Sequence, residues 1–354
     1  MSVLPSLTYT NPVLNEDFAD PTVLLSDGVY HAYATQTVTA DGPINLQHST
    51  SSNLVEWTKP GEALPVKPEW AQRMQQFWAP FVYHHVPSNK YLMYYSAQPD
   101  PDAVPDGYGP GHALAVATSN KPEGPFVDSG APILWALPIS QARSDFENID
   151  PFVCNDPLTG MLRIYFGSGF QPIKTCLLTD DGLRLSTQDC LTPVLHPNTG
   201  TPYENLFEAP LLLQRGAGFL LLCSGDDCCG PTLKYGVMAA RGRSPIGPFT
   251  LMAEDTQQPD SVFLRGNDRF GVPGHACVRD DANNIDWLIY HAVDSRQPKL
   301  VHSTGGHDVR RVMCLDRLFY HDDGWPYVTN GSPSIGVNPS PALPAQRAVG
   351  GESP

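Results

Sequence analysis

The sequence predicts an all-β fold, a five-bladed β-propeller, and two observations support this prediction. The first is a phrase that recurs five times: an apolar run behind a proline or alanine, a turn, and a second apolar strand. The copies open at Pro21, Pro80, Pro151, Pro210 and Ala276. The second is their spacing of 59, 71, 59 and 66 residues, which is typical of strand-rich repeats that form propeller blades. Because one such repeat is too small to bury a core alone, the copies are expected to stack.

Each phrase is expected to form the innermost hairpin of a blade. In the first copy, the apolar run 22–25 leads into Ser26-Asp27-Gly28, and the alternating run 29–35 returns as the second strand. Outer strands recur as well, because 113–119 and 236–241 are each followed by a Gly-Pro-Phe sequence. The five blades are predicted at 11–68, 70–134, 146–197, 203–254 and 271–328.

The repeats indicate one propeller domain over residues 11–330, with a lead-in at 1–10 and a mobile Pro-, Gly- and Ala-rich tail at 331–354. The segment 99–111 is rich in Pro, Asp and Gly, so it is expected to be a long loop, either a binding loop or a solvated excursion. The segment 257–269 is interpreted only as a connection. No helix longer than a turn or two is expected, and 69–76 is the best candidate.

The composition excludes some partners. A net charge of −15 over 354 residues disfavours a polyanion, so nucleic acid is not expected, whereas a neutral sugar is compatible. No apolar run approaches membrane-spanning length, so no membrane partner is expected. The start of the chain shows no secretory signal. The chain as given is therefore expected to be cytoplasmic, or secreted if a leader has been removed. The sequence predicts no oligomeric state.

Eight cysteines are too few for a disulfide scaffold at this length. Cys154, Cys223 and Cys277 lie in apolar strands, where a free cysteine packs as a small hydrophobe. Cys228 and Cys229 are adjacent in a turn. A vicinal disulfide or a soft-metal site is conceivable at this pair, and an ordinary structural turn is the favoured interpretation.

Three of the phrases begin with a carboxylate, at Asp20, Asp150 and Glu208, and the other two carry Trp78 and His275. Stacked blades would bring these five side chains to one end of the central channel. Two carboxylates can cleave a glycosidic bond, a third would raise the pKa of the acid, and an indole can stack on a sugar. A single Asp-Pro is more often a turn opener than a catalyst, but three acids at matching repeat positions favour a shared site.

Neighbouring groups have structural interpretations. Asp17 and Glu204 lie near the key acids and are expected to be capping or supporting groups. Trp78 alone is more often a core residue than a sugar contact, and His275 alone is more often a hydrogen-bonded structural residue than a ligand. On the channel axis, however, His275 could bind a cation directly or through water.

These motifs resemble those of glycoside hydrolase family 43 in their order and spacing, over nearly the whole repeat region. The matching segments are Asn11-Pro12-Val13-Leu14 through Asp20-Pro21, Phe77-Trp78-Ala79-Pro80, Asn148-Ile149-Asp150-Pro151, Phe207-Glu208-Ala209-Pro210, Gly274-His275 and Asp323-Gly324-Trp325-Pro326. The related fructan-cleaving propellers would show Trp-Met-Asn-Asp-Pro in the first blade and Arg-Asp-Pro in the third. This chain has Phe-Ala-Asp-Pro and Ile-Asp-Pro there, so that alternative is excluded.

The resemblance implies a five-bladed propeller that hydrolyses arabinofuranosyl or xylosyl linkages with inversion. It implies that Asp20 is the general base and Glu208 the general acid, with Asp150 raising the pKa of Glu208 and orienting it. His275 matches the axial histidine of the family, which often lies beside a calcium ion or a water cluster. Calcium is therefore the one implied cofactor, and no organic cofactor is expected.

The resemblance also suggests substrate contacts. Trp78 and Phe81 in the second blade and Arg311 ahead of Leu315-Asp316 are expected to contact the sugar, although family members often carry an acid where this chain has Phe81. Arg310 competes with Arg311 for the match. Cys228-Cys229-Gly230, Tyr235 and Arg241 look like the fourth-blade segment of arabinan-active members.

The expected substrate is consequently an arabinofuranosyl unit of a plant cell-wall polysaccharide or oligosaccharide, with β-D-xylosidase action as the runner-up. Whether the enzyme acts on chain ends or within chains depends on loops such as 99–111. A sugar-binding propeller without catalysis is the alternative from another class, but such a protein would be expected to lack one of the three acids. A purely structural propeller gives no reason for those acids.

Overall fold

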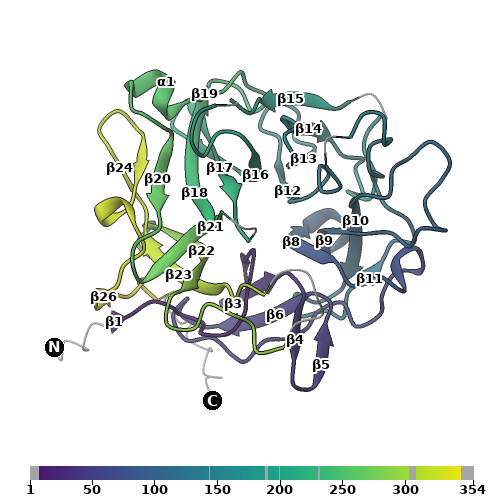
Figure 1. The fold of residues 1–354 in the computed structure, drawn as a ribbon, viewed down its shortest axis with the longest axis horizontal. Helices are drawn as coiled ribbons and strands as arrows, with labels where there is room; N and C mark the ends of the chain where they lie inside the picture. Colours follow the sequence, from purple (N-terminus) through teal and green to yellow (C-terminus); the bar gives the residue numbers. More distant parts are fainter. Residues whose placement is uncertain are drawn as a thin grey trace, which may run out of the picture.

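The computed structural model describes residues 8–142, 144–187, 190–198, 200–229, 232–302 and 308–343, which form five antiparallel sheets around a central axis (Figure 1). Blade 1 contains β2 (Thr22–Ser26), β3 (Val29–Ala34), β6 (Gln47–Ser51) and β7 (Gly61–Glu62). Blade 2 contains β8 (Phe77–His85), β9 (Lys90–Ala97), β10 (Ala113–Ser119) and β11 (Val127–Asp128). Blade 3 contains β12 (Phe152–Asn155), β13 (Leu162–Phe166), β14 (Ile173–Leu177) and β15 (Thr192–Leu195).

Blade 4 contains β16 (Phe207–Arg215), β17 (Gly218–Asp227), β18 (Lys234–Gly242) and β19 (Thr250–Leu251), and β20 (Val262–Arg265) pairs with β18. Blade 5 contains β21 (Phe270–Asp280), β22 (Asp286–Asp294) and β23 (Val312–Arg317). The first strands of the blades contact one another in a closed ring, from β2 through β8, β12, β16 and β21 back to β2. The five-bladed propeller is therefore confirmed.

Apolar side chains from the alternating strands pack between neighbouring blades. One core cluster joins blades 2 to 5, a second joins blades 1 and 2, and a third joins blades 5 and 1. Because β-strands point alternate side chains to opposite faces, each blade presents apolar residues to both neighbours. The outer strands pair in the predicted order, and Phe126 and Phe249 are both buried in the core.

The start of the chain closes the ring. Leu14 forms a bridge with Met313 on β23, and the backbone N–H of Val13 donates to the Met313 carbonyl at 3.0 Å. β1 (Thr8–Tyr9) pairs with β26 (Asn338–Pro339), as Figure 1 shows where the purple and yellow ends of the ribbon meet. Residues far apart in the sequence thus hold blade 5 against blade 1.

The tail prediction needs correction where the structure describes it. Residues 332–343 pack on the propeller, because the backbone N–H of Ser334 donates to Asp316 at 3.2 Å and the Asn11 side chain donates to Ser334. A composition rich in proline and glycine gave no sign of these long-range contacts. Residues 1–7 and 344–354, the remainder of the predicted lead-in and tail, lie outside the described residues.

The segments predicted to be irregular contain short elements of secondary structure. The connection at 257–269 contributes β20, and the helix candidate 69–76 contains only the 3-10 turn Glu69–Ala71. Other short elements are the hairpins β4–β5 (Thr37–Thr39, Gly42–Ile44) and β24–β25 (Phe319–Tyr320, Pro326–Tyr327), the 3-10 turns Val86–Ser88 and Thr329–Gly331, and α1 (Met252–Thr256). Among the described residues, no helix is long and apolar enough to span a bilayer.

Candidate active site

One pocket, of about 410 Å³, opens where the innermost strands begin. Its lining includes five of the predicted site residues, two further aspartates and six apolar or sulfur-containing residues. The lining residues are Asp20, Trp78, Phe146, Ile149, Asp150, Phe170, Leu206, Glu208, Asp226, Asp227, Cys228, Cys229 and Arg311. The fold therefore brings together side chains from blades 1 to 5 that are almost 300 positions apart in the sequence.

All five blades share one backbone feature where their innermost strands reach the pocket. A residue in the left-handed conformation stands shortly before or within each innermost strand, with φ of 56° at Asp20, 49° at Ala79, 61° at Asp150, 52° at Ala209 and 47° at His275. Glu208 stands one residue before this position, level with Trp78. The prediction that the three acids occupy matching positions is thus corrected: Asp20 and Asp150 match, and Glu208 is offset by one residue.

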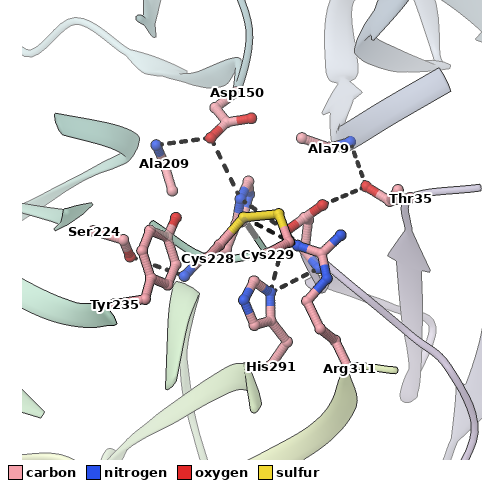
Figure 2. A network of polar contacts seen from close by, with 12 residues as sticks. Thr35, Ala79, Asp150, Ala209, Ser224, Cys228, Cys229, Tyr235, His291 and Arg311 are labelled. Carbon is pink, nitrogen blue, oxygen red and sulfur yellow. Dashed lines mark hydrogen bonds and ion pairs between the residues drawn. A yellow bond between two sulfur atoms is a disulfide. The ribbon is translucent and has the colours of Figure 1, made fainter. Parts of the chain in front are cut away.

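A ring of hydrogen bonds links the left-handed residues to the preceding blade. Their backbone N–H groups donate to hydroxyl or imidazole acceptors near the end of the second strand: Ala79 to Thr35 at 2.9 Å (Figure 2), Asp150 to Ser96 at 3.2 Å, His275 to Ser224 at 2.9 Å, and Asp20 to His291 Nδ1 at 3.1 Å. In blade 4, Ala209 instead donates to Asp150 Oδ2 at 3.0 Å. Because Ala209 does not use Ser168 as its acceptor, the Ser168 hydroxyl donates to Glu208.

Asp20 is a buried carboxylate surrounded by donors. Oδ2 accepts from the Thr35 hydroxyl at 2.5 Å and Oδ1 from Arg311 Nη1 at 2.9 Å. Burial alone would raise the pKa of Asp20, but the Arg311 guanidinium and the imidazoles of His275 and His291 hold it well below the usual range. Asp20 is therefore ionised at neutral pH.

Glu208 has the opposite tendency. Oε2 accepts from the Ser168 hydroxyl and Oε1 from the Tyr235 hydroxyl, both at 2.6 Å. Burial raises the pKa of Glu208, these two hydrogen bonds oppose the rise, and the negative charge of Asp20 adds to it. The net direction is upward, so the Glu208 carboxyl retains its proton to higher pH than an exposed glutamate.

Asp150 is coupled to Glu208. Burial, followed by the charges of Glu208 and Asp20, raises the pKa of Asp150 well above its ordinary value. Because the repulsion between two carboxylates acts on both, the pair is expected to hold one proton and to titrate as a unit. Asp150 also accepts from the backbone N–H of Ala209, the residue after Glu208, and so fixes the strand entry that carries the acid.

His275 is outside the pocket lining but lies close to two of the acids. Its Nδ1 is 3.5 Å from Asp20 Oδ1 and 3.5 Å from Asp150 Oδ2. Burial lowers the pKa of His275 to about 4, so the imidazole is neutral at pH 7. Calcium takes six to eight oxygen ligands, and the described residues hold no grouping of three or more His, Cys, Asp or Glu suited to a metal. These side chains do not form a calcium site by themselves, and the calcium expectation stays a prediction.

Of the three residues expected to contact the substrate, Trp78 and Arg311 line the pocket and Phe81 does not. Trp78 lines the pocket and stacks on His112 with a ring-centroid distance of 3.9 Å. Arg311 lines the pocket, whereas Arg310 turns to Asn15, and the sugar contact expected of Arg311 stays a prediction. Phe81 does not reach the pocket: it is 7% exposed and packs edge-on against Phe152 between blades 2 and 3, because the bulge at Ala79 and Pro80 turns it into the core.

Asp17 and Glu204 prove to be supporting groups. Asp17 accepts from the backbone N–H of Arg311 at 3.0 Å and from the Thr37 hydroxyl at 2.7 Å. Glu204 accepts from the Ser261 hydroxyl at 2.8 Å. Neither residue lines the pocket, so their capping interpretation holds.

Two disulfides appear among the described residues, Cys176–Cys190 and Cys228–Cys229. The second corrects the expectation of an ordinary turn at Cys228 and Cys229, and it lines the pocket (Figure 2). Its neighbour in the fourth-blade match, Gly230, lies outside the described residues, and Arg241 lies away from the pocket, bonded to the Asp323 carbonyl at 3.0 Å.

Sequence reasoning missed the groups that tune the acids. Thr35, Ser168, Tyr235 and His291 contact Asp20 or Glu208 directly. A signal for three of them was present, because Thr35, Ser168 and His291 all stand at the end of the second strand of a repeat. Tyr235 lies on β18, and its role required the fold.

A propeller that gathers a carboxylate with a lowered pKa, a carboxyl group with a raised pKa and an indole in one pocket has the components of a glycosidase site. The comparisons agree with this class. The family model of glycosyl hydrolases family 43 matches residues 9–326, and the chain belongs to this family. The protein is therefore a glycoside hydrolase.

Individual relatives differ in substrate. The chain is 26% identical over 327 residues to the β-D-galactofuranosidase xynD of Aspergillus niger, covering 89% of this chain and 83% of that protein. It is 24% identical to the extracellular endo-α-(1→5)-L-arabinanase 2 of Bacillus subtilis, covering 91% and 73%. The α-L-arabinanase of Cellvibrio cellulosa, whose structure has also been solved with arabinohexaose, shares the fold with a TM-score of 0.69 at 21% identity, covering 89% and 96%.

Proposed function

We propose that this glycosidase releases L-arabinofuranosyl units from plant cell-wall arabinan, arabinoxylan or their oligosaccharides with inversion of configuration. The observation that carries the proposal is the contrast between two carboxyl groups in one pocket. Arg311 holds the pKa of Asp20 well below its usual range, whereas burial and the negative charge of Asp20 raise the pKa of Glu208. Environments that separate the pKa values of two carboxyl groups assign one as base and the other as acid.

In the proposed mechanism, Asp20 accepts a proton from a water molecule that attacks the anomeric carbon. Glu208 donates its proton to the leaving glycosidic oxygen as the bond breaks, so no charged alkoxide forms. Asp150 keeps the acid protonated before the reaction, and its hydrogen bond from Ala209 positions the strand entry that carries Glu208. The negative charge of Asp20 also stabilises the oxocarbenium-like transition state.

The furanosyl preference rests on the relatives, two of which are named for L-arabinan and one for a D-galactofuranoside. Both sugars have five-membered rings, and galactofuranose carries one carbon more. β-D-Galactofuranosidase action is therefore a second candidate, favoured by the 26% identity to the Aspergillus niger protein. β-D-Xylosidase action remains the runner-up from the sequence.

An oxidising compartment is part of the proposal. Disulfides persist in secreted proteins and are rare in the cytosol, and two are formed among the described residues. Of the two localisations expected from the sequence, this supports the secreted one. Alkylation of free thiols in protein isolated from its native cells, with and without prior reduction, checks the point.

The proposed function is tested with p-nitrophenyl α-L-arabinofuranoside, β-D-galactofuranoside and β-D-xyloside, and with arabino-oligosaccharides. Asp20→Asn is the control, because every substrate needs an activated water. Release from the arabinoside by the wild type, with loss in the variant, supports the proposal. Release from the xyloside or galactofuranoside alone would keep the mechanism and overturn the substrate, and no release from any substrate would overturn both.

A further inference from the structure

The loop that joins β17 to β18 places a disulfide in the wall of the catalytic pocket. Cys228 and Cys229 are each half-buried, and both line the pocket with Asp20, Asp150 and Glu208. In Figure 2 the sulfur–sulfur bond lies among the pocket residues, beside the Arg311 side chain. Adjacent residues in extended backbone direct their side chains to opposite faces, so a bond between them forces both sulfur atoms onto one side. The result is a small, continuous sulfur surface.

This surface is anchored at both ends. Behind the pocket, Cys228 packs against the cluster of Tyr235, Val272 and Val293. At the loop, the Asp227 carboxylate accepts from the backbone N–H groups of Cys229 at 3.3 Å and Thr232 at 2.9 Å. The disulfide is therefore held in place and does not project as a free loop tip.

The surface also touches the group that holds the proposed base. Cys228 Sγ is 3.9 Å from Arg311 Nη1, the same nitrogen that donates to Asp20 Oδ1 at 2.9 Å. Sulfur packs beside the guanidinium on one side, and the backbone N–H of Arg311 is held by Asp17. Opening the bond would leave two separately rotating thiols next to Arg311.

We propose that the Cys228–Cys229 disulfide is a substrate-contacting wall that receives the carbon face of the bound sugar and contributes to affinity and specificity. The proposal rests on the proposed glycosidase function. A disulfide has no proton to donate and is only a weak acceptor, so it contacts C–H groups and leaves the sugar hydroxyls to the carboxylates and Arg311. The role is binding and positioning, so it acts on KM more than on kcat.

The test compares the wild type with Cys228→Ala/Cys229→Ala, using the glycoside that the wild type cleaves best. The proposal predicts that KM rises about tenfold, the effect of a lost apolar contact in a sugar pocket. The same proposal predicts that kcat changes by less than about threefold, because the carboxylates remain. The matched control is Cys176→Ala/Cys190→Ala, which removes the other disulfide outside the pocket lining and is expected to leave KM unchanged.

Reduction of the folded enzyme gives a second readout that does not depend on how the alanine variant folds. A trialkylphosphine converts the disulfide into two thiols and is oxidised to its oxide with the oxygen of a water molecule. Reduction should raise KM of the wild type and of Cys176→Ala/Cys190→Ala, and reoxidation should restore it. It should leave Cys228→Ala/Cys229→Ala unaffected, and mass spectrometry after alkylation identifies the opened pair.

The outcomes separate the two claims. Wild-type turnover with the same KM in Cys228→Ala/Cys229→Ala, or an equal response of this variant to reduction, would overturn the role of the disulfide and leave the proposed function standing. No turnover by the wild type on any glycoside would overturn the proposed function and this inference with it.

Discussion

The entrances of blades 2 and 4 have the same backbone and different chemistry. Each reads as an aromatic residue, a pocket residue, a left-handed alanine and a proline, with φ of 49° at Ala79 and 52° at Ala209. Each also shifts the register of its innermost hairpin, between Trp78 and Phe81 and between Glu208 and Leu211. Blade 2 thereby presents an indole and blade 4 a carboxylic acid.

The difference lies in what the neighbouring strands supply. Trp78 is half-exposed and stacks on His112, whereas Glu208 is 8% exposed and is held by two hydroxyl groups. In blade 2 the backbone N–H of Ala79 donates to the Thr35 hydroxyl of the preceding blade. In blade 4 the backbone N–H of Ala209 donates to the Asp150 carboxylate instead. The repeated backbone therefore sets where each side chain stands, and in the proposed mechanism the neighbouring groups decide whether that side chain binds the sugar or reacts with it.

The comparison predicts its largest effect for Glu208→Gln. Loss of the proposed acid should lower kcat on an arabino-oligosaccharide by about 10³-fold, because the leaving oxygen must then depart unprotonated. The loss should be smaller on a p-nitrophenyl glycoside, whose leaving group needs little protonation. Steady-state kinetics on both substrates measure the difference, and equal losses would argue against an acid role for Glu208.

Asp150→Asn tests whether the acid depends on its partner. In the proposed mechanism, activity requires ionised Asp20 and protonated Glu208, so kcat/KM should fall on the alkaline side as Glu208 loses its proton. Removing the like charge of Asp150 lowers the pKa of Glu208, so this alkaline limb should move to lower pH, with a fall in kcat/KM on the order of 10²-fold. A pH–rate profile with an unmoved alkaline limb would contradict the coupling.

Trp78→Ala addresses the blade 2 side of the comparison. If the indole binds sugar and takes no part in proton transfer, KM should rise about tenfold while kcat and the pH profile stay near those of the wild type. Trp78→Phe, which keeps an aromatic face, is the matched control and should lie between them. A kcat loss as large as that of Glu208→Gln would show that the two entrances do not differ as described.

The smallest effects should come from Ala79→Gly and Ala209→Gly. Both alanines have positive φ, which costs an L-residue about 1 kcal/mol and costs glycine almost nothing. Part of this gain is offset by the greater freedom of glycine in the unfolded chain, so each variant should shift the free energy of unfolding by less than about 1 kcal/mol. Urea unfolding curves measure both shifts, and a strong loss at one site only would show that the two backbones are not equivalent.

The fold could be predicted from the sequence because the same apolar hairpin recurs five times. The repeated Pro21, Pro80, Pro151 and Pro210 marked the entrances of blades 1 to 4, and the propeller closes as the five repeats predict. The acids of the site were visible for the same reason. The one-residue offset of Glu208 is also written in the sequence, because Asp20 and Asp150 directly precede a proline whereas Glu208 stands two residues before Pro210.

Other features depended on contacts between distant segments. Phe81 has the hydrophobicity of either a sugar contact or a core residue, and only its packing on Phe152 decides between them. The docking of Ser334 on Asp316 and the pairing of Cys176 with Cys190 join positions with no local pattern. Arg311 was distinguished from Arg310 only by the direction that each side chain takes from adjacent positions.

The central claim, that Asp20 activates water opposite Glu208, is tested most directly by the stereochemistry of the first product. Proton NMR during hydrolysis of an α-L-arabinofuranoside, before the released sugar equilibrates, shows which anomer forms. The account predicts β-L-arabinofuranose as the initial product. Initial release of the α-anomer would mean retention through a covalent intermediate and would contradict the role assigned to Asp20.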